Sequence, residues 1–191
     1  MNLSTITDKE FDSLYPQKIK MLSCTHWTPV AIAKKAVRYL GAEGKSILDI
    51  GSGSGKFCLI AAANSKSKIT GVEQRENLVQ ISRKLALTYK LENLDFINDD
   101  MLNIDFTSYD NFYFFNSFEE NINLKDKLGK ENEFNLDKFN TYILFLKERF
   151  DSAPLGTKIV TYCGECEEIP ASYRLVESGN KGKLKFWRKG I

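Results

Sequence analysis

The feature that most restricts the fold of this chain is the segment ILDIGSGSGKFCLIAA, residues 47–62. Its first residues predict a short buried strand, and the apolar run after Lys56 predicts a helix. Between the two stand Gly51, Gly53 and Gly55. Because glycine costs conformational entropy, such a turn indicates that bare backbone is needed there. In an open α/β sheet this turn lies at the carboxyl end of the first strand, where the ligand crevice forms.

Strand and helix patterns alternate along the rest of the chain. Apolar residues at helical spacing predict helices over residues 30–40, 56–65, 76–91 and 136–150. Short apolar runs predict strands over residues 46–50, 67–73, 94–98, 110–116 and 157–163. Residues 173–176 and 184–188 flank a turn with Asn and Gly, so they predict an antiparallel hairpin. We therefore expect an α/β fold with a doubly wound, mostly parallel seven-stranded sheet, an antiparallel C-terminal hairpin and helices on both faces.

Length and composition fit one ordinary globular domain. The chain has 191 residues, of which 42% are hydrophobic and 27% charged. The net charge of +2 is too small to argue for a nucleic-acid partner. No apolar run is long enough to span a bilayer, and the polar start MNLSTITDKEF does not resemble a signal peptide. We expect a cytoplasmic protein with an N-terminal arm or lid over residues 1–27 and a single domain over residues 28–191.

Two common nucleotide-binding turns do not fit the glycine spacing. A P-loop needs four residues between its glycines and Ser or Thr after the lysine. Here three residues separate Gly51 from Gly55, and Phe57 follows Lys56. The dinucleotide fingerprint needs a third glycine where Lys56 stands. The P-loop is thus excluded, and the dinucleotide motif fails by one residue.

Three motifs in register resemble those of the class I S-adenosylmethionine-dependent methyltransferases. They are ILDIGSGSG, the acidic end of KITGVE, and FINDDML. The family's sheet also ends in an antiparallel hairpin, as the tail of this chain is predicted to do. The resemblance covers roughly residues 28–188, and it implies S-adenosylmethionine as the cofactor.

The resemblance also assigns roles to single residues. Asp49 and the turn with Gly51, Ser52, Gly53 and Gly55 would receive the methionine part of the cofactor. Glu73 would bind the ribose hydroxyls, and Gln74 follows where the adenine begins. Asp100 would accept a hydrogen bond from the adenine amino group, and Met101 would offer its backbone N–H and an apolar contact. The alternative is that the three acids only end their strands, as Asp often does.

The end of the fourth predicted strand is where this family places residues that face the methyl acceptor. Many nitrogen methyltransferases carry Asn or Asp, two prolines and an aromatic residue there. This chain has Asn116, Ser117 and Phe118, so it keeps the asparagine and the aromatic ring but lacks both prolines. A planar or cationic nitrogen is the favoured acceptor, with Asn116 and Phe118 as the catalytic residues, because an aromatic ring can also face a cation. Alternatively, Asn116 is only a turn residue.

Two segments near the predicted crevice leave alternatives open. Trp27 directly precedes a predicted helix that starts at Thr28-Pro29. The hydroxyl of Thr28 is expected to cap this helix. Trp27 either packs beside the helix start or closes over the cofactor as part of a lid, so we include it among the candidate cofactor residues, with Asn116. The charged insertion over residues 119–135 is either solvated surface or a determinant of the substrate.

Other features do not decide the function. Cys163 and Cys166 have the spacing of a redox pair or half a zinc site, but a loop after a strand is the simpler interpretation, and we expect no metal. Residues 71–86 resemble the corresponding stretch of small lysine methyltransferases. This short similarity does not assign a substrate, and we expect the acceptor to be a nitrogen of a protein side chain, of an RNA or of a small molecule. A non-catalytic S-adenosylmethionine-binding protein and a nicotinamide-dependent oxidoreductase remain as alternatives.

Overall fold

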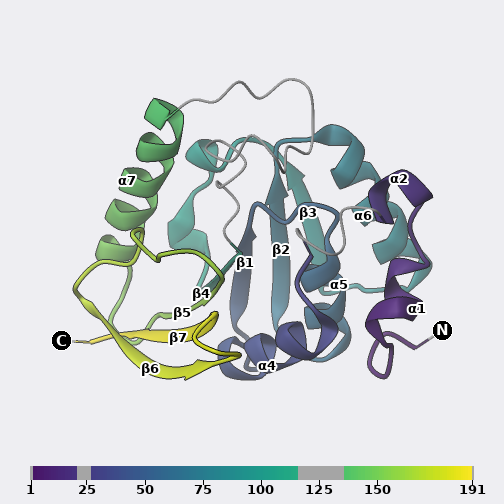
Figure 1. Cartoon of the computed structure of the whole chain (residues 1–191), viewed down its shortest axis with the longest axis horizontal. Coiled ribbons are helices and arrows are strands. Elements are labelled where there is room, and N and C mark those ends of the chain that lie inside the picture. The colour runs from purple at the N-terminus through teal and green to yellow at the C-terminus, as the bar shows by residue number, and fades with distance from the viewer. Residues whose placement is uncertain (1, 21–26, 116–135, 191) are drawn as a thin grey trace.

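The computed structural model describes residues 2–20, 27–115 and 136–190 (Figure 1). Its helices are α1 (Asp8–Asp12), α2 (Gln17–Lys20), α4 (Val30–Leu40), α5 (Lys56–Ala63), α6 (Glu76–Thr88) and α7 (Leu136–Ser152). Its strands are β1 (Ser46–Ile50), β2 (Lys68–Glu73), β3 (Leu94–Asn98), β4 (Asn111–Phe114), β5 (Lys158–Tyr162), β6 (Tyr173–Gly179) and β7 (Leu184–Lys189). Two short 3₁₀ turns, Met101–Asn103 and Phe106–Ser108, lie between β3 and β4.

The seven strands form one sheet in the order β3-β2-β1-β4-β5-β7-β6. The pairs from β3 to β5 are parallel, and β7 is antiparallel to both β5 and β6. The predicted fold class is therefore confirmed, including the C-terminal hairpin. The order reverses at β1 and β4, so the crevice of an open α/β sheet is expected beyond their carboxyl ends. In the part of the chain that the structure describes, no helix is long and apolar enough to cross a membrane.

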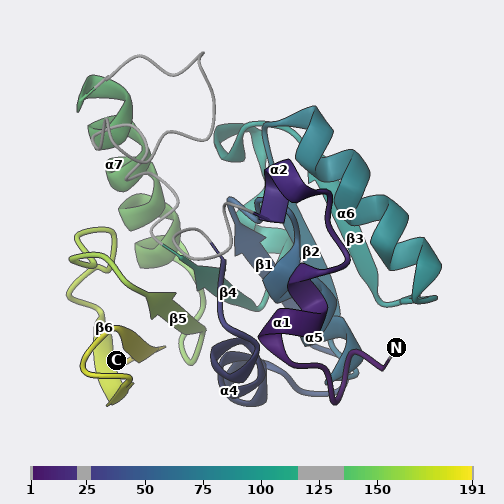
Figure 2. The ribbon, with the colours of Figure 1, turned by 45° about the vertical axis from the view of Figure 1, so that its right-hand side comes forward.

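Helices cover both faces of the sheet, because its strands alternate buried side chains toward each side. Figure 2 shows α7 on one face and α4, α5 and α6 on the other. Ile47 of β1 packs in the cluster with α4 and α5, whereas the next residue, Leu48, packs in the cluster with α7. The sequences of the parallel strands are consequently continuous apolar runs, rather than alternations of apolar and polar residues.

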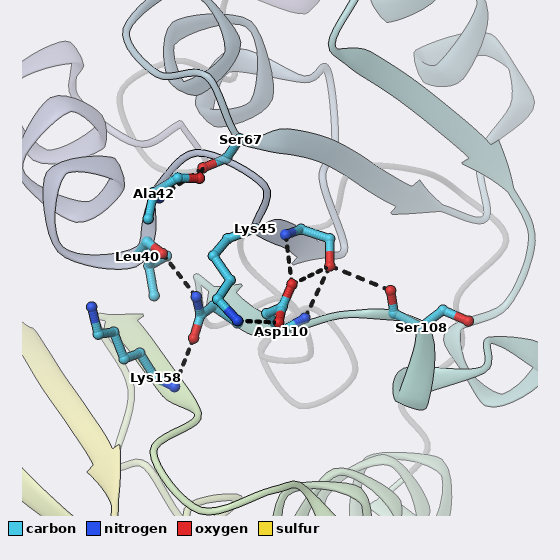
Figure 3. A network of polar contacts seen from close by, with 9 residues as sticks. Leu40, Ala42, Lys45, Ser67, Ser108, Asp110 and Lys158 are labelled. Atoms are coloured by element: carbon cyan, nitrogen blue, oxygen red, sulfur yellow. Dashed lines mark hydrogen bonds and ion pairs between the residues drawn. The ribbon is translucent and has the colours of Figure 1, made fainter.

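A polar network ties together the amino ends of the central strands (Figure 3). The side chain of Asn111 donates from Nδ2 to the carbonyl of Leu40 (2.8 Å), and its Oδ1 accepts from the backbone N–H of Lys158 (2.9 Å). The carboxylate of Asp110 accepts from both the backbone N–H and the hydroxyl of Ser46, each at 2.9 Å. These bonds join the end of α4 to β1, β4 and β5 at the edge opposite the expected crevice.

The start of α4 differs from the sequence-based prediction. Thr28 does not cap the helix, and Pro29 is its N-cap residue rather than its first helical residue. The hydroxyl of Thr28 instead pairs with the hydroxyl of Tyr113 at 2.7 Å inside the core. The backbone N–H of Val30, which has no acceptor within the helix, donates to Oδ1 of Asp8 at 2.9 Å. The prediction of a local cap was wrong because two tertiary contacts satisfy these groups instead.

The sequence patterns did not reveal helix α1, which anchors the N-terminal segment to the core. Thr7 and Glu10 form a capping box at its start, so its first N–H groups are satisfied locally. The ammonium of Lys56, the first residue of α5, is 2.6 Å from Oδ1 of Asp8 and 2.9 Å from Oδ1 of Asp12. The side chain of Lys56 is only 5% exposed. A buried cation therefore joins α1 to the helix that follows the glycine turn.

Replacing Lys56 by methionine keeps an apolar stem beside the rings of Phe11 and Trp27 but removes the charge. The mostly buried carboxylate of Asp12 then has no cation facing it. We expect the free energy of unfolding in denaturant to fall by about 1–3 kcal/mol, less than for a fully buried pair because the side chain of Asp8 is half exposed. Adding Asp12→Asn should recover part of the loss. Equal stability of Lys56→Met and the unchanged protein would contradict a structural role for the pair.

Candidate functional site

The turn between β1 and α5 has the left-handed backbone that its glycines suggested. Gly51, Gly53 and Gly55 have φ angles of 73°, 55° and 80°. The backbone N–H of Ser52 donates to the carbonyl of Val72 (2.9 Å), which fastens the turn to β2. The N–H of Gly55 donates to the carbonyl of Ser52 at 2.9 Å and closes the turn. Residues other than glycine are strained in this region of φ, so the sequence pattern and the conformation agree.

The glycines of this region serve different purposes. A Cβ atom built on Gly53 meets nothing within 4 Å, so this part of the turn borders open space. A Cβ on Gly55 would lie 2.8 Å from both the ring of Phe96 and the hydroxyl of Ser82. Gly71 on β2, which sequence reasoning missed, would bring a Cβ to 2.7 Å from the hydroxyl of Ser52. Gly55 and Gly71 therefore allow close packing, whereas Gly53 leaves room for a ligand.

Asp49 lies on β1 just before the turn, and its side chain is buried. The thiol of Cys58 on α5 donates to its Oδ2 at 3.0 Å. Burial raises the pKa of Asp49 to about 7; the Cys58 hydrogen bond lowers it in part, and nearby Glu73 raises it further. The carboxyl group is thus only partly ionised near neutral pH, and a cationic ligand nearby would favour release of its proton. The sequence offered no indication of the Cys58 contact.

Glu73 ends β2, and its buried carboxylate is fully hydrogen-bonded. Oε2 accepts from the backbone N–H of Gly53 at 3.0 Å. The guanidinium of Arg75 donates to both oxygens, each at 2.9 Å, and the backbone N–H of Arg75 donates to Oε1. The carboxylate therefore touches the turn directly, and Arg75 neutralises it. Ribose hydroxyls that bind Glu73 must share or displace the bonds from Arg75, a residue that the sequence analysis did not single out.

The geometry of the turn fits the cofactor that the resemblance implies. In the part of the chain that the structure describes, the hydroxyl of Ser52 is buried and has no hydrogen-bond partner. It packs against Gly71 of β2, whereas the next residue, Gly53, borders open space and donates its backbone N–H to Glu73. A sulfonium and an ammonium group suit such an acidic setting, and ribose hydroxyls suit a carboxylate acceptor. Bare backbone, an unpaired hydroxyl and two acids are thus the donor and acceptor set that S-adenosylmethionine requires.

The predicted adenine end of the site is less open than its sequence suggests. Oδ2 of Asp100 accepts from the hydroxyl of Tyr142 on α7 at 2.6 Å, and Oδ1 accepts from the backbone N–H of Leu102 at 3.1 Å. The side chain of Met101 is buried in the cluster on the α7 face. Gln74 is exposed. Tyr142 is a further residue here that the strand-end motifs could not reveal, because it comes from a distant helix.

Trp27 is buried against the N-terminal segment. Its ring lies 4.6 Å from that of Tyr15, between ring centroids, and the ammonium of Lys56 lies 5.5 Å from the Trp27 ring centroid. The hydroxyl of Tyr15 donates to the carbonyl of Ser54 in the glycine turn at 2.7 Å. The segment before α4 therefore contacts the turn itself. Whether Trp27 also covers a bound cofactor stays a prediction, as does the division into an arm over residues 1–27 and a domain over residues 28–191.

Several candidate residues lie outside the described ranges. They are Asn116, Phe118 and the insertion over residues 119–135. Phe115, just before them, packs on Tyr162 at the end of β5 with ring centroids 4.9 Å apart. Cys163 and Cys166 lie in the loop after β5, as the simpler interpretation predicted, and within the described part of the chain neither forms a disulfide. Among the residues with described positions, no group of three or more His, Cys, Asp or Glu side chains could hold a metal ion.

Comparison with known proteins agrees with these features. Residues 42–178 match the family model described as a methyltransferase domain. Over 68 residues the chain is 34% identical to a protein of Methanosphaera stadtmanae named "Probable ribosomal RNA small subunit methyltransferase A". That match covers 36% of this chain and 25% of the relative, so the chain spans about a quarter of the length of the curated relative it matches.

Solved structures share the fold at low sequence identity. An RNA methyltransferase from Salinibacter ruber, solved in complex with S-adenosyl-L-homocysteine, superposes with a TM-score of 0.60 at 17% identity. The match covers 85% of this chain and 92% of that one. TrmN from Thermus thermophilus superposes with a TM-score of 0.64 at 19% identity, over 90% of this chain and 52% of that one. At these identities the likeness concerns the fold alone.

The raised pKa of Asp49 predicts how the stability of this site depends on pH. The folded protein holds this proton more tightly than the unfolded chain, so the contribution is present at acid pH and is lost as the pH rises toward about 7. Asp49→Asn keeps a neutral side chain. Its stability relative to the unchanged protein should therefore increase between about pH 4 and about pH 7, by up to roughly 1.4 kcal/mol per pH unit, and level off above that. Denaturant unfolding at several pH values measures this difference, and a constant difference would refute the assignment.

Proposed function

The chain belongs to the S-adenosylmethionine-dependent methyltransferase domain family, and we propose that it transfers the methyl group of S-adenosylmethionine to a nitrogen atom of an RNA. The observation that carries the proposal is the turn at Gly53, which borders open space and whose backbone N–H lies 3.0 Å from the carboxylate of Glu73. The relatives from Methanosphaera stadtmanae and Salinibacter ruber, both named as methyltransferases of RNA, support the choice of acceptor. Such an acceptor also agrees with the expectation of a cytoplasmic protein.

In this proposal the acids around the turn hold the cofactor. Glu73 accepts hydrogen bonds from the ribose hydroxyls, and the backbone of Gly51, Gly53 and Gly55 leaves room for the methionine part. Ser52 contributes its free hydroxyl. Asp49 ionises when a positive group binds near it, because a nearby cation lowers the pKa of a carboxyl group. Asp100 and Met101 border the adenine, with Gln74 at its edge.

The cofactor supplies a methyl group on a positively charged sulfur, which a nitrogen lone pair can attack in line. The chain's own contribution is to hold the acceptor nitrogen in that line, and such positioning alone accounts for large rate gains. We assign this task to Asn116, whose side-chain oxygen would accept a hydrogen bond from the acceptor nitrogen, and to Phe118, whose ring would pack against it. Trp27 would help to exclude water as part of a lid.

The proposal is tested by incubating the purified protein with S-adenosylmethionine labelled in the methyl group and with RNA, protein and small-molecule fractions of the source cell. We expect label in the RNA, on a nucleobase nitrogen identified by mass spectrometry after digestion to nucleosides. Glu73→Ala should weaken cofactor binding in calorimetry by about 1.5–3 kcal/mol, the scale of a charged hydrogen bond. Glu76→Ala, an exposed acid three residues later, is the matched control and should bind normally. Label only in the protein or small-molecule fraction would overturn the RNA proposal.

Asn116→Ala should separate acceptor positioning from cofactor binding. We expect nearly unchanged affinity for S-adenosylmethionine in calorimetry. Both kcat and kcat/KM should fall on the order of tenfold to a thousandfold, because the lost bond acts mainly in the transition state. Normal turnover of this variant at saturating acceptor would remove Asn116 from the mechanism.

A further inference from the structure

The C-terminal hairpin carries far more positive charge than the chain as a whole. Residues 173–189 hold a single acidic residue, Glu177, and six basic ones: Arg174, Lys181, Lys183, Lys185, Arg188 and Lys189. The complete chain has a net charge of only +2. The rest of the molecule is therefore net negative, and the positive charge gathers on the β6–β7 hairpin at one edge of the sheet (Figure 1).

Three charged residues of the hairpin form contacts within the protein that explain their positions. The ammonium of Lys189 donates to main-chain carbonyls at the end of α7, including that of Ala153 at 2.7 Å. The ammonium of Lys185 donates to the sulfur of Cys166 at 3.5 Å. Glu177 pairs with Lys35 of α4 at 2.6 Å, so it is already neutralised.

Four exposed cations remain, and they define a surface that we call the cationic hairpin surface: Arg174, Lys181, Lys183 and Arg188. Within the described part of the chain, none of the four forms an ion pair with an acidic side chain. Exposed cations of most proteins are interspersed with acids. A surface with four cations and one paired acid indicates a partner that supplies the negative charge.

One end of this surface places like charges directly opposite each other. Arg174 of β6 is the register partner of Arg188 of β7, and Arg188 is in turn the register partner of Lys158 of β5. Side chains at such positions lie on the same face, about 5 Å apart at Cβ. Lys158 packs on the ring of Tyr39, and its ammonium donates to the Tyr39 carbonyl. Among the residues with described positions the two arginines have no such partner, and opposed like charges destabilise a sheet, so this row indicates that an anion compensates them.

The other end of the surface lies beside the predicted acceptor site. Lys181 and Lys183 belong to the turn between β6 and β7, and that turn meets the carboxyl end of β5 because Leu184 pairs with Tyr162. The backbone N–H of Cys163 donates to the carbonyl of Lys183 at 2.7 Å. The ring of Tyr162 also packs on that of Phe115, the residue before Asn116. The turn, at the start of β7, is thus three strands away from the glycine turn of β1, or about 14 Å along the sheet.

We propose that the cationic hairpin surface binds the phosphate backbone of the RNA acceptor and leads one strand of it to the crevice beyond β1 and β4. This inference rests on the proposed function for its choice of RNA. The hairpin is about six residues long, so the surface extends over roughly 20 Å from the arginine pair to the turn. Contacts from arginine and lysine to phosphates position the nucleic acid without selecting a base, which leaves base selection to the crevice.

Binding of a fluorescently labelled, mixed-sequence, single-stranded RNA oligonucleotide, measured by anisotropy at several salt concentrations, tests the surface. We expect Lys181→Gln/Lys183→Gln to weaken binding roughly tenfold at moderate salt and to reduce the slope of log Kd against log salt by about 1.4, or ~0.7 for each lost phosphate contact. The matched control is Lys84→Gln/Lys90→Gln on and after α6, at the opposite side of the molecule (Figure 1). Each pair removes two exposed positive charges, and each includes one lysine with a left-handed backbone, Lys90 (φ 53°) and Lys181 (φ 56°). The control should bind as the unchanged protein does.

Substitution of Arg174 and Arg188 distinguishes a role in RNA binding from a structural role. Arg174→Gln/Arg188→Gln should weaken RNA binding by a similar factor while the melting temperature of the free protein stays equal or rises, because the change removes the opposed charges. A fall in melting temperature together with unchanged RNA binding would make these arginines structural residues and overturn the proposal at this end of the surface.

The outcomes separate this inference from the proposed function. RNA methylation that proceeds equally well in both hairpin variants refutes the docking surface and leaves the proposed function standing. Hairpin-dependent RNA binding without methyl transfer to RNA refutes the proposed function and leaves the surface standing. Polyglutamate serves as the competing polyanion: if it binds more tightly than the RNA and depends on the same lysines, the partner is an acidic protein and the RNA proposal is wrong.

Discussion

The close approach of two backbones at the glycine turn sets the position of everything around it. A Cβ on Gly71 would collide with Ser52, and a Cβ on Gly55 would collide with Phe96 and Ser82. Their absence lets the turn lie directly on β2 and lets α5 start against α6 and β3. Lys56 is the next residue after Gly55, and its buried ammonium forms ion pairs with Asp8 and Asp12 of α1. The N-terminal segment, with Tyr15 on the carbonyl of Ser54, is therefore placed by the same turn that borders the crevice.

Three acids at the carboxyl edge of the sheet have different electrostatic settings. Asp49 is buried beside a thiol, and burial raises its pKa to about 7. Glu73 is equally buried, but a guanidinium and two backbone N–H groups satisfy its charge. Asp100 is partly exposed and accepts from a tyrosine of α7. Burial without a cation raises the pKa of Asp49, whereas the other two acids are distinguished by their hydrogen-bond donors, so acids at neighbouring strand ends have different surroundings.

The charge of the molecule is uneven in a way that its net value hides. A net charge of +2 over 191 residues argues for no particular partner. The β-hairpin brings Arg174 next to Arg188 and carries Lys181 and Lys183 to the edge of the sheet where the parallel strands end. The paired Glu177 leaves these cations unopposed. Strand register, rather than composition, turns an ordinary sequence into a locally cationic surface.

Local sequence patterns were enough to predict the fold class and the position of the glycine turn. Strand and helix periodicity predicted all seven strands and the helices that cover the sheet, and three glycines marked the turn at the end of β1. These features are local, because a glycine turn and an alternation of apolar residues act over a few neighbouring positions.

Only the tertiary structure decided which groups meet. Thr28 was expected to cap α4, but its hydroxyl binds Tyr113, and Asp8 of the unforeseen helix α1 takes the helix N–H instead. Cys58 on Asp49, Arg75 on Glu73 and Tyr142 on Asp100 were equally invisible in the motifs. The physical reason is that a buried polar group takes whichever partner the packed chain brings within hydrogen-bond distance. For most of these groups that partner comes from another element of the fold rather than from the neighbouring residues.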